Sequence, residues 1–274
     1  DKLGIKDLSA DDKLNMFTKK VTGELLGGKV LSKNVGESSD IDLQMDKAIK
    51  QSKDIELVKD KEGNLLAPNG KKSNLNETQW RIVRTDAFKN WFGDWENDAK
   101  NASKVVDENG EPLVVYHGTR ENFTEFKNRV FGYQGFYFTT NPKVAKTYGN
   151  KILPMFLNER NPTVVEMDGQ SYLDNDTYID DLTEEGKQDN KGIQFNNFID
   201  PLDPSDALRT PSSNIFVVFE PNQIKLADGT NTTFNPESND IRFQIAKNPS
   251  KEEIGKAYDK AQQYLETTDF NFDT

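Results

Sequence analysis

Four residues that could do chemistry together gather on two short apolar runs and the segment after them. His117 is the single histidine of the 274-residue chain, and it lies near the end of the run Val115-Tyr-His-Gly-Thr119. Taken alone, such a histidine is typical of a structural residue bonded to backbone. Gly118 beside it lets a ligand approach the main chain and bond its N–H and C=O groups. With Tyr137 on a second run and Tyr148 beyond it, the set suits an aromatic ligand that bears an amide and is held between rings.

Composition excludes several other kinds of site. The net charge of -11 opposes nucleic-acid binding, which depends on Lys and Arg neutralising phosphates. The chain has no cysteine and one histidine, so disulfides, thiolate sites and histidine-rich metal sites are excluded. No apolar run approaches the roughly 18 residues of a membrane span. We therefore expect no metal, no membrane and no nucleic acid, and a reducing, cytoplasmic location.

The candidate residues need strands and one helix to position them. Residues 104–118 read as a hairpin around the turn Asp107-Glu-Asn-Gly110, with a buried second strand. A helix with Pro at its first turn is predicted over 141–148. The other predicted strands are 135–139, 152–157, 214–219, 223–226 and 241–245. Residues 166–212 are acidic and rich in Asn and Pro, and we expect mostly surface loop around a small apolar island.

Helical patterns flank this region and suggest the domain limits. Asn74 and Glu77 have capping-box spacing before an aromatic stripe from Trp80 to Trp95, which we interpret as core of the domain. A helix capped by Ser9, a weaker stretch around 41–49 and a helix capped by Ser250 are also predicted. We expect a polar, partly helical region over 1–72, a catalytic domain over 73–246 and an amphipathic helix or linker over 247–274. The chain lacks an initial Met and a leader, so we expect a segment of a longer protein.

Several ordered motifs resemble the ADP-ribosyltransferases of the diphtheria-toxin and poly(ADP-ribose) polymerase type. The most similar members are the transferase modules of phage polyvalent proteins, over about residues 74–246. His-Gly-Thr alone would be a weak signal, whereas several motifs in the same order are specific. The segments that carry the resemblance are Phe88-Lys-Asn-Trp-Phe-Gly-Asp-Trp95, Val105 to Thr119, Gly135 to Tyr148, Val217 to Lys225 and Asn239-Asp-Ile-Arg-Phe243.

The resemblance implies an α+β fold in which two mostly antiparallel sheets form a split β-sandwich with NAD in the cleft, plus N-terminal helices. It implies that His117 bonds the adenosine-side ribose, that Gly118 offers backbone to the nicotinamide amide, and that Tyr137 and Tyr148 flank the nicotinamide ring. Ala145 stands where the polymerases have Ser, which removes one carboxamide hydrogen bond. The implied NAD-binding set is His117, Gly118, Thr119, Tyr137, Phe138, Tyr148 and Gln223.

The resemblance also exposes a missing carboxylate. An ungapped match places Ile215 where polymerising members carry Glu, as in the His-Tyr-Ile pattern of mono-transferases. A carboxylate would stabilise the positive charge that develops on the ribose, and isoleucine cannot. Glu220 is the nearest acid in sequence, but an odd offset on a strand directs it to the opposite face. It either begins the Pro-Asn turn or reaches the site through a bulge, so the candidate catalytic set is His117, Tyr137, Ile215 and Glu220.

The expected function is therefore cleavage of NAD at the nicotinamide–ribose bond and transfer of one ADP-ribose to a macromolecule. Placement of NAD and an acceptor that brings its own carboxylate could supply much of the acceleration. The resemblance to phage proteins suggests a bacterial host protein as acceptor, in the host cytosol, with carriage in a virion as an option. Two alternatives are an NAD glycohydrolase, which the poor water activation at Ile215 disfavours, and a degenerate module that only binds NAD or a partner.

Overall fold

The computed structural model describes residues 47, 50–127, 134–201, 205, 209–231 and 233–242. These residues lie within one unit, Gln44–Gln244. The helices predicted after Ser9 and Ser250, and the apolar residues of the predicted stretch 41–49, fall outside the described residues. None of the described helices is long and apolar enough to cross a membrane.

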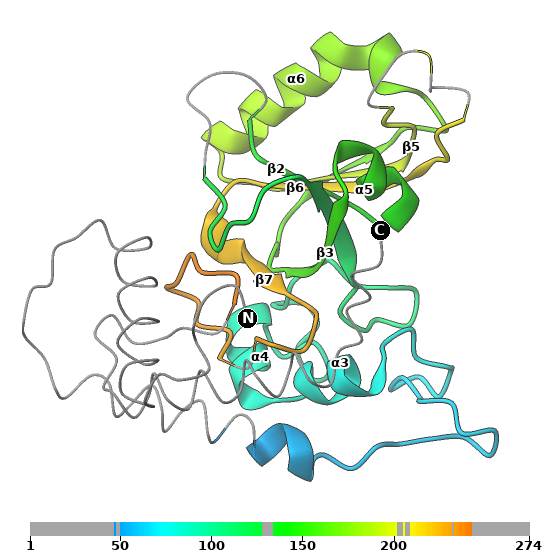
Figure 1. Cartoon of the computed structure of the whole chain (residues 1–274), viewed down its shortest axis with the longest axis vertical. Helices are drawn as coiled ribbons and strands as arrows, with labels where there is room; N and C mark the ends of the chain where they lie inside the picture. Colours follow the sequence, from blue (N-terminus) through cyan, green and yellow to red (C-terminus); the bar gives the residue numbers. More distant parts are fainter. Residues whose placement is uncertain are drawn as a thin grey trace, which may run out of the picture. The chain divides into compact units, whose positions relative to one another are not determined.

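A seven-stranded sheet forms the centre of this unit (Figure 1), with the order β4-β5-β6-β2-β1-β3-β7. Its neighbours are antiparallel except for β4 and β5, which run parallel. Strands are confirmed in the predicted regions 113–118, 135–139, 152–157, 214–219 and 223–226. The strands are β1 (Val115–Thr119), β2 (Phe136–Thr139), β3 (Lys151–Leu157), β4 (Thr163–Glu166), β5 (Ile193–Phe198), β6 (Ser213–Val218) and β7 (Ile224–Leu226).

The predicted division into two sheets is not confirmed, because β1 and β2 do pair. They meet at the single pair Tyr116↔Thr139. By contrast, β1 has five registered pairs with β3, and β2 has four with β6. The sheet therefore consists of two well-paired halves, β4-β5-β6-β2 and β1-β3-β7, joined at one point. We call this point the β1–β2 junction.

The two faces of the sheet carry different hydrophobic clusters. Figure 1 shows α6 (Tyr172–Gln188) along one side of the sheet and α3 (Glu77–Ile82) and α4 (Asp86–Phe92) on the other. Alternation along each strand sends neighbouring side chains to opposite faces. The first cluster includes Val115, Phe126, Phe136, Phe138, Met155, Leu157 and Ile241. The second includes Ile179 of α6 with Ile193, Phe195, Ile215, Val217 and Phe219.

The aromatic stripe is core, as predicted, but it belongs to two helices rather than one. These are α3 (Glu77–Ile82) and α4 (Asp86–Phe92), and Trp95 lies beyond the second. The break comes at Thr85, whose hydroxyl oxygen accepts the Phe88 N–H at 3.3 Å and so begins a new helix. The first capping box uses Asn76 and Gln79, two residues after the predicted pair.

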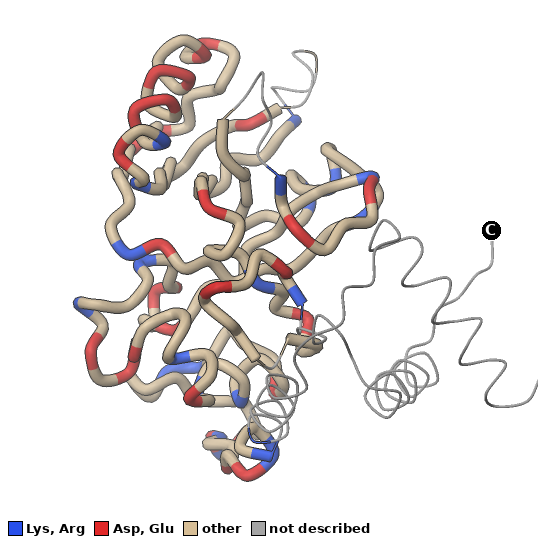
Figure 2. The backbone as a smooth tube through the Cα atoms, turned by 90° about the vertical axis from the view of Figure 1, so that its left-hand side faces the viewer, with Lys and Arg blue, Asp and Glu red and all other residues tan. Residues whose placement is uncertain are grey.

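The prediction of mostly loop over 166–212 was wrong. This stretch contains α6, which Ser171 caps, and β5. Most positions of α6 are acidic or exposed, and its buried residues are Ile179, Thr183 and Gly186. So few apolar contacts leave too weak a helical period to detect beneath the charge. Figure 2 shows the acidic positions concentrated along this helix.

Two further predictions were right only in part. The first strand of the predicted hairpin is reduced to one bridge, Val106↔Pro112, beside the Gly110 turn. The helix over 141–148 is confirmed as α5 (Pro142–Tyr148), with Asn141 as its cap and Pro in its first turn. Of the predicted strand 241–245 only the first two residues are described, and Ile241 bonds through its backbone to Thr124 and Leu226.

Candidate functional site

His117 sits in an aromatic cage on β1. Its ring centroid lies 4.9 Å from that of Phe126 and 5.5 Å from that of Phe138, with Phe123 at 6.2 Å. Its Nδ1 donates to the Tyr137 carbonyl oxygen at 2.9 Å. Burial lowers the pKa of His117 below 6.5, against the opposing effect of this hydrogen bond. At neutral pH the ring is therefore uncharged with its proton on Nδ1, which leaves Nε2 as an acceptor.

The backbone around His117 explains why β1 and β2 part here. Pro154 of β3 stands opposite Tyr116 and has no N–H, so this pair cannot exchange two hydrogen bonds. Alternation along an antiparallel strand then directs the His117 main chain toward β3, and those of Tyr116 and Gly118 toward β2. On β2, the Thr140 N–H bonds a carbonyl of the β6 side at 3.0 Å. Because the backbone groups of successive residues point to opposite sides of a strand, those of Tyr137 face β1.

At this position a hydrogen bond from a side chain takes the place of a backbone hydrogen bond between β1 and β2. The Tyr137 carbonyl accepts the His117 ring N–H, and Gly118 has no registered partner on β2. Half-buried Gly118 therefore turns its N–H and C=O toward a point where the described pairing of the two strands has ended. A primary amide has a donor and an acceptor at matching spacing, and it could complete both groups.

Helix α5 lies directly on this part of β1. A Cβ on Gly118 would come 1.7 Å from the Ala145 carbonyl oxygen, and one on Gly149 would come 2.1 Å from the Thr119 carbonyl. Gly118 is therefore needed for the packing of α5 on β1, a role that the sequence analysis did not predict. A ligand can use the Gly118 peptide only from the β2 side.

The two tyrosines lie on the α5 and α6 side of the sheet. Tyr137 packs against the cluster under α6. Tyr148 is 36% exposed, and its Cβ would lie 3.2 Å from a Cβ on Gly118. Through Gly118 the helix end thus brings Tyr148 to the junction, where Tyr137 also lies.

Asp200 is an acid near this site that sequence reasoning did not select. It follows β5, is half-buried, and receives a hydrogen bond from the Tyr148 side chain. Burial raises the pKa of this carboxyl, against the lowering effect of the Tyr148 hydrogen bond. The sequence offers no signal for it, because it is one of many aspartates in a stretch interpreted as loop.

Three of the predicted site residues, Ile215, Phe138 and Thr119, are engaged in packing or hydrogen bonds within the fold. Ile215 is 2% exposed and is registered between Thr139 and Phe195, on the face opposite the His117 ring. Phe138 is 1% exposed and packs against that ring at a tilt of 50°. The Thr119 hydroxyl oxygen accepts the Glu121 N–H at 3.1 Å. Ile215 is thus core beneath the junction and not an open wall of it.

Glu220 directly precedes the turn η2 (Pro221–Gln223) after β6, and Gln223 ends it. The pairing of β6 with β2 is regular from Ile215 to Val218, so no bulge there redirects the exposed Glu220. The Gln223 amide nitrogen donates to the Asn158 carbonyl and its oxygen accepts the Glu220 N–H, at 3.1 and 3.0 Å. These contacts give Gln223 a role in fixing the turn.

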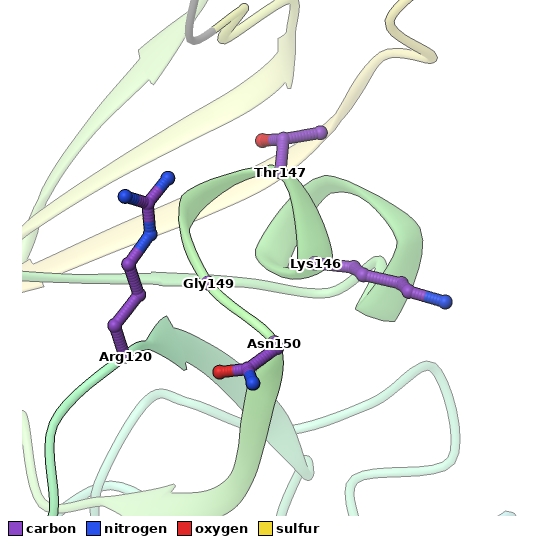
Figure 3. Close-up of a pocket in the computed structure, with 5 residues that line it drawn as sticks. All are labelled: Arg120, Lys146, Thr147, Gly149 and Asn150. Carbon is purple, nitrogen blue, oxygen red and sulfur yellow. The ribbon is translucent and has the colours of Figure 1, made fainter. Parts of the chain in front are cut away.

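A basic pocket opens beside the end of β1. It has a volume of about 490 Å³ and is lined by Arg120, Lys146, Thr147, Gly149 and Asn150. Figure 3 shows Arg120 and Asn150 on one side of the end of α5 and Lys146 pointing away from Arg120. No acidic residue lines it, although the chain carries a net charge of -11. The pocket therefore suits an anion.

Part of the chain matches a known protein family. The family model of ADP-ribosyltransferases in polyvalent proteins matches residues 107–234, whereas no curated protein and no solved structure matches the chain. The matched span contains all seven strands and the junction with His117, Gly118, Tyr137 and Tyr148. Within the described part of the chain no three His, Cys, Asp or Glu side chains form a metal site. Residues 107–234 are therefore an ADP-ribosyltransferase domain of the polyvalent-protein family.

Proposed function

We propose that this domain is a mono-ADP-ribosyltransferase, which cleaves NAD at the nicotinamide–ribose bond and transfers ADP-ribose to a macromolecular acceptor. One observation carries the proposal. The His117 ring takes the Tyr137 carbonyl, so the adjacent Gly118 peptide faces the end of the ladder, with Tyr148 beside it. The nicotinamide carboxamide fits these peptide groups, and its ring fits against an exposed tyrosine.

The remaining parts of NAD have matching groups nearby. The acceptor atom Nε2 of His117 suits a ribose hydroxyl. The pyrophosphate suits the basic pocket, because Arg120 lines it directly after the end of β1 and a guanidinium group can bind phosphate oxygens in a planar fork. The proposed site therefore combines Tyr148, Gly118 and His117 at the junction with Arg120 in the pocket beside the end of β1.

The chemistry requires stabilisation of charge on the ribose. The bond from C1′ to the nicotinamide nitrogen breaks, and nicotinamide leaves with the electron pair. A nucleophilic atom of the acceptor then bonds C1′, and its proton passes to a base or to solvent. We propose Asp200 for the missing carboxylate, since it lies by Tyr148 whereas Ile215 is buried core. Because burial raises its pKa above the ordinary carboxyl value, Asp200 is also a stronger base than an exposed aspartate.

We further propose a bacterial host protein as the acceptor and the host cytosol as the place of action. The support is the membership of the domain in the polyvalent-protein family, together with the resemblance to phage modules. The acidic face of α6 favours acceptors with a basic surface, because opposite charges steer association.

The test is incubation of the chain with isotope-labelled NAD, alone and with bacterial lysate, followed by intact-mass analysis and assay of released nicotinamide. We expect nicotinamide release and a mass increase of one ADP-ribose on a protein. Both should be lost in Arg120→Gln and kept in Lys143→Gln, a control at an exposed position of α5 that does not line the pocket. Release without any modified protein would instead show a glycohydrolase. NAD binding without release would leave the module that only binds.

A further inference from the structure

Lys225 is a buried cation that the proposed reaction does not use. It is 1% exposed in β7, and its Nζ donates to the carbonyl oxygens of Ser238 and Asp240 at 2.6 and 2.8 Å. A buried ammonium group is stable only when hydrogen bonds replace its water. These bonds hold residues 238–241, which we call the 238–241 segment, against the edge strand β7.

The 238–241 segment in turn holds the loop that cages His117. The Leu226 N–H bonds the Ile241 carbonyl at 2.8 Å, and the Ile241 N–H bonds the Thr124 carbonyl at 2.9 Å. Asp240 also bridges Glu125 in antiparallel fashion. The segment thus links β7 to residues 124 and 125 by backbone alone.

The next residue of that loop reaches the site. Phe126 is buried and packs edge-to-face on the His117 ring at 4.9 Å, and Phe123 packs on Phe126 at 4.8 Å. Packed aromatic rings transmit a displacement because the interior has little free volume. A continuous set of contacts therefore runs from Lys225 through the segment and Phe126 to His117.

We propose that Lys225 is a positioning residue: by holding the 238–241 segment it sets the place of Phe126 on the His117 ring, so loss of its proton is felt at that ring. That the ring serves NAD rests on the function proposed above, whereas the contacts do not. The charged groups that face Lys225 are Asp240 and Glu125, and Arg242 forms an ion pair with Asp240 at 3.2 Å.

The charge on Lys225 changes within an accessible pH range. Burial lowers the pKa of Lys225 from 10.5 to about 8, although Asp240 and Glu125 raise it. A neutral amine makes weaker hydrogen bonds to the two carbonyls than an ammonium group does. Between pH 8 and 10.5 the unfolded chain binds more protons here, so this group adds to overall stability as the pH rises. Loosening of the segment should therefore occur without unfolding.

The single histidine makes the test direct. We would follow the imidazole ¹H–¹³C NMR signal of His117 from pH 5 to 10 without NAD, and the melting temperature in parallel. Besides the titration of His117 itself, we expect a second inflection near pH 8 with no fall in melting temperature attributable to it. The inflection should vanish in Lys225→Met and persist in Lys143→Met, an exposed position on α5.

A second variant covers the case in which Lys225→Met does not fold. Glu125 is exposed, and Glu125→Gln removes one charge that raises the pKa of Lys225. The inflection should then move to lower pH in a folded protein. A wild-type signal without an inflection near pH 8 would overturn the proposal, as would an inflection that neither variant changes. Neither result depends on whether NAD is the ligand.

Discussion

The strand β2 is bonded very differently on its two sides. With β6 it forms a regular ladder of four pairs, and with β1 it forms one. On the β6 side the backbone groups are paired in the ladder, and Ile215 belongs to the core with 2% of its surface exposed. On the β1 side the ladder stops, a histidine side chain takes one carbonyl, and the Gly118 peptide is left facing the junction. Binding groups are thus supplied where pairing ends, and core where it continues.

This difference also separates binding from acid function. The position at which the resemblance implies a Glu in polymerising members is Ile215, which lies within the complete ladder and is buried. The acid by the tyrosine is Asp200, which comes from the segment after β5. In the proposed site, the groups for the dinucleotide and the carboxylate for charge stabilisation therefore come from different segments of the chain.

The largest expected effect is the loss of stability when a charge is introduced on the β6 side of β2, where the ladder is complete. Ile215→Glu would place a carboxylate in the cluster under α6, and we expect a loss of about 3–5 kcal/mol of unfolding free energy. Urea unfolding measures it, with Ile215→Leu as the control at less than about 1.5 kcal/mol. If Ile215→Glu folds normally and hydrolyses NAD faster, Ile215 faces the site and the two sides do not differ as described.

The second-largest expected effect concerns the packing of α5 on β1, on the side of β2 where the ladder stops. Gly118→Ala would drive a methyl group into the Ala145 carbonyl at 1.7 Å, and we expect a loss of about 2–3 kcal/mol. Gly63 has open space but a φ of +84°, so Gly63→Ala should cost only about 1 kcal/mol. Equal costs in thermal or urea unfolding would mean that α5 does not press on β1 as observed.

A pair of acid variants tests which carboxylate serves the reaction. We expect Asp200→Asn to lower transfer about 100-fold, the scale of losing a charge-stabilising or acid–base group. Glu220→Gln should leave transfer nearly intact, because Glu220 is exposed in the turn after β6. Initial rates with one acceptor separate the two. A large loss in Glu220→Gln alone would assign the acid role to the turn.

The smallest expected effect is a pH dependence on the His117 side. The folded pKa of His117 lies below the value of 6.5 that it has when unfolded. The unfolded chain therefore binds more protons below pH 6.5, so the stability this group contributes above that pH is lost as the pH falls through the folded pKa. A protonated ring also loses its Nε2 acceptor, so NAD affinity should fall in parallel. Calorimetry on either side of the folded titration of His117, located first from its imidazole NMR signal, would show it, and an affinity unchanged through that titration would argue against contact through Nε2.

The comparison also shows what the sequence could and could not predict. The short strands around His117 and Tyr137, and the helix that ends at Tyr148, were predicted because apolar runs and Pro or Gly punctuation mark them locally. The family resemblance supplied the roles of these residues. The helix α6 was missed because its acidic surface hides its buried face.

The remaining features depend on contacts distant in sequence. No local sequence pattern indicates the single β1–β2 pair, the close packing of α5 on Gly118 or the hydrogen bond between Tyr148 and Asp200, because each is a tertiary contact. The carbonyl of Tyr137 likewise finds the His117 ring only once two strands meet. Residue types therefore indicated the site, and its geometry required the fold.

The most direct measurement is a titration of the folded wild-type chain with NAD, followed through the imidazole NMR signal of its single histidine. We expect a saturable shift of the His117 signal that excess nicotinamide reverses, with weaker NAD binding in Arg120→Gln and unchanged nicotinamide binding. A His117 signal that stays in place up to millimolar NAD would contradict an NAD site at the β1–β2 junction.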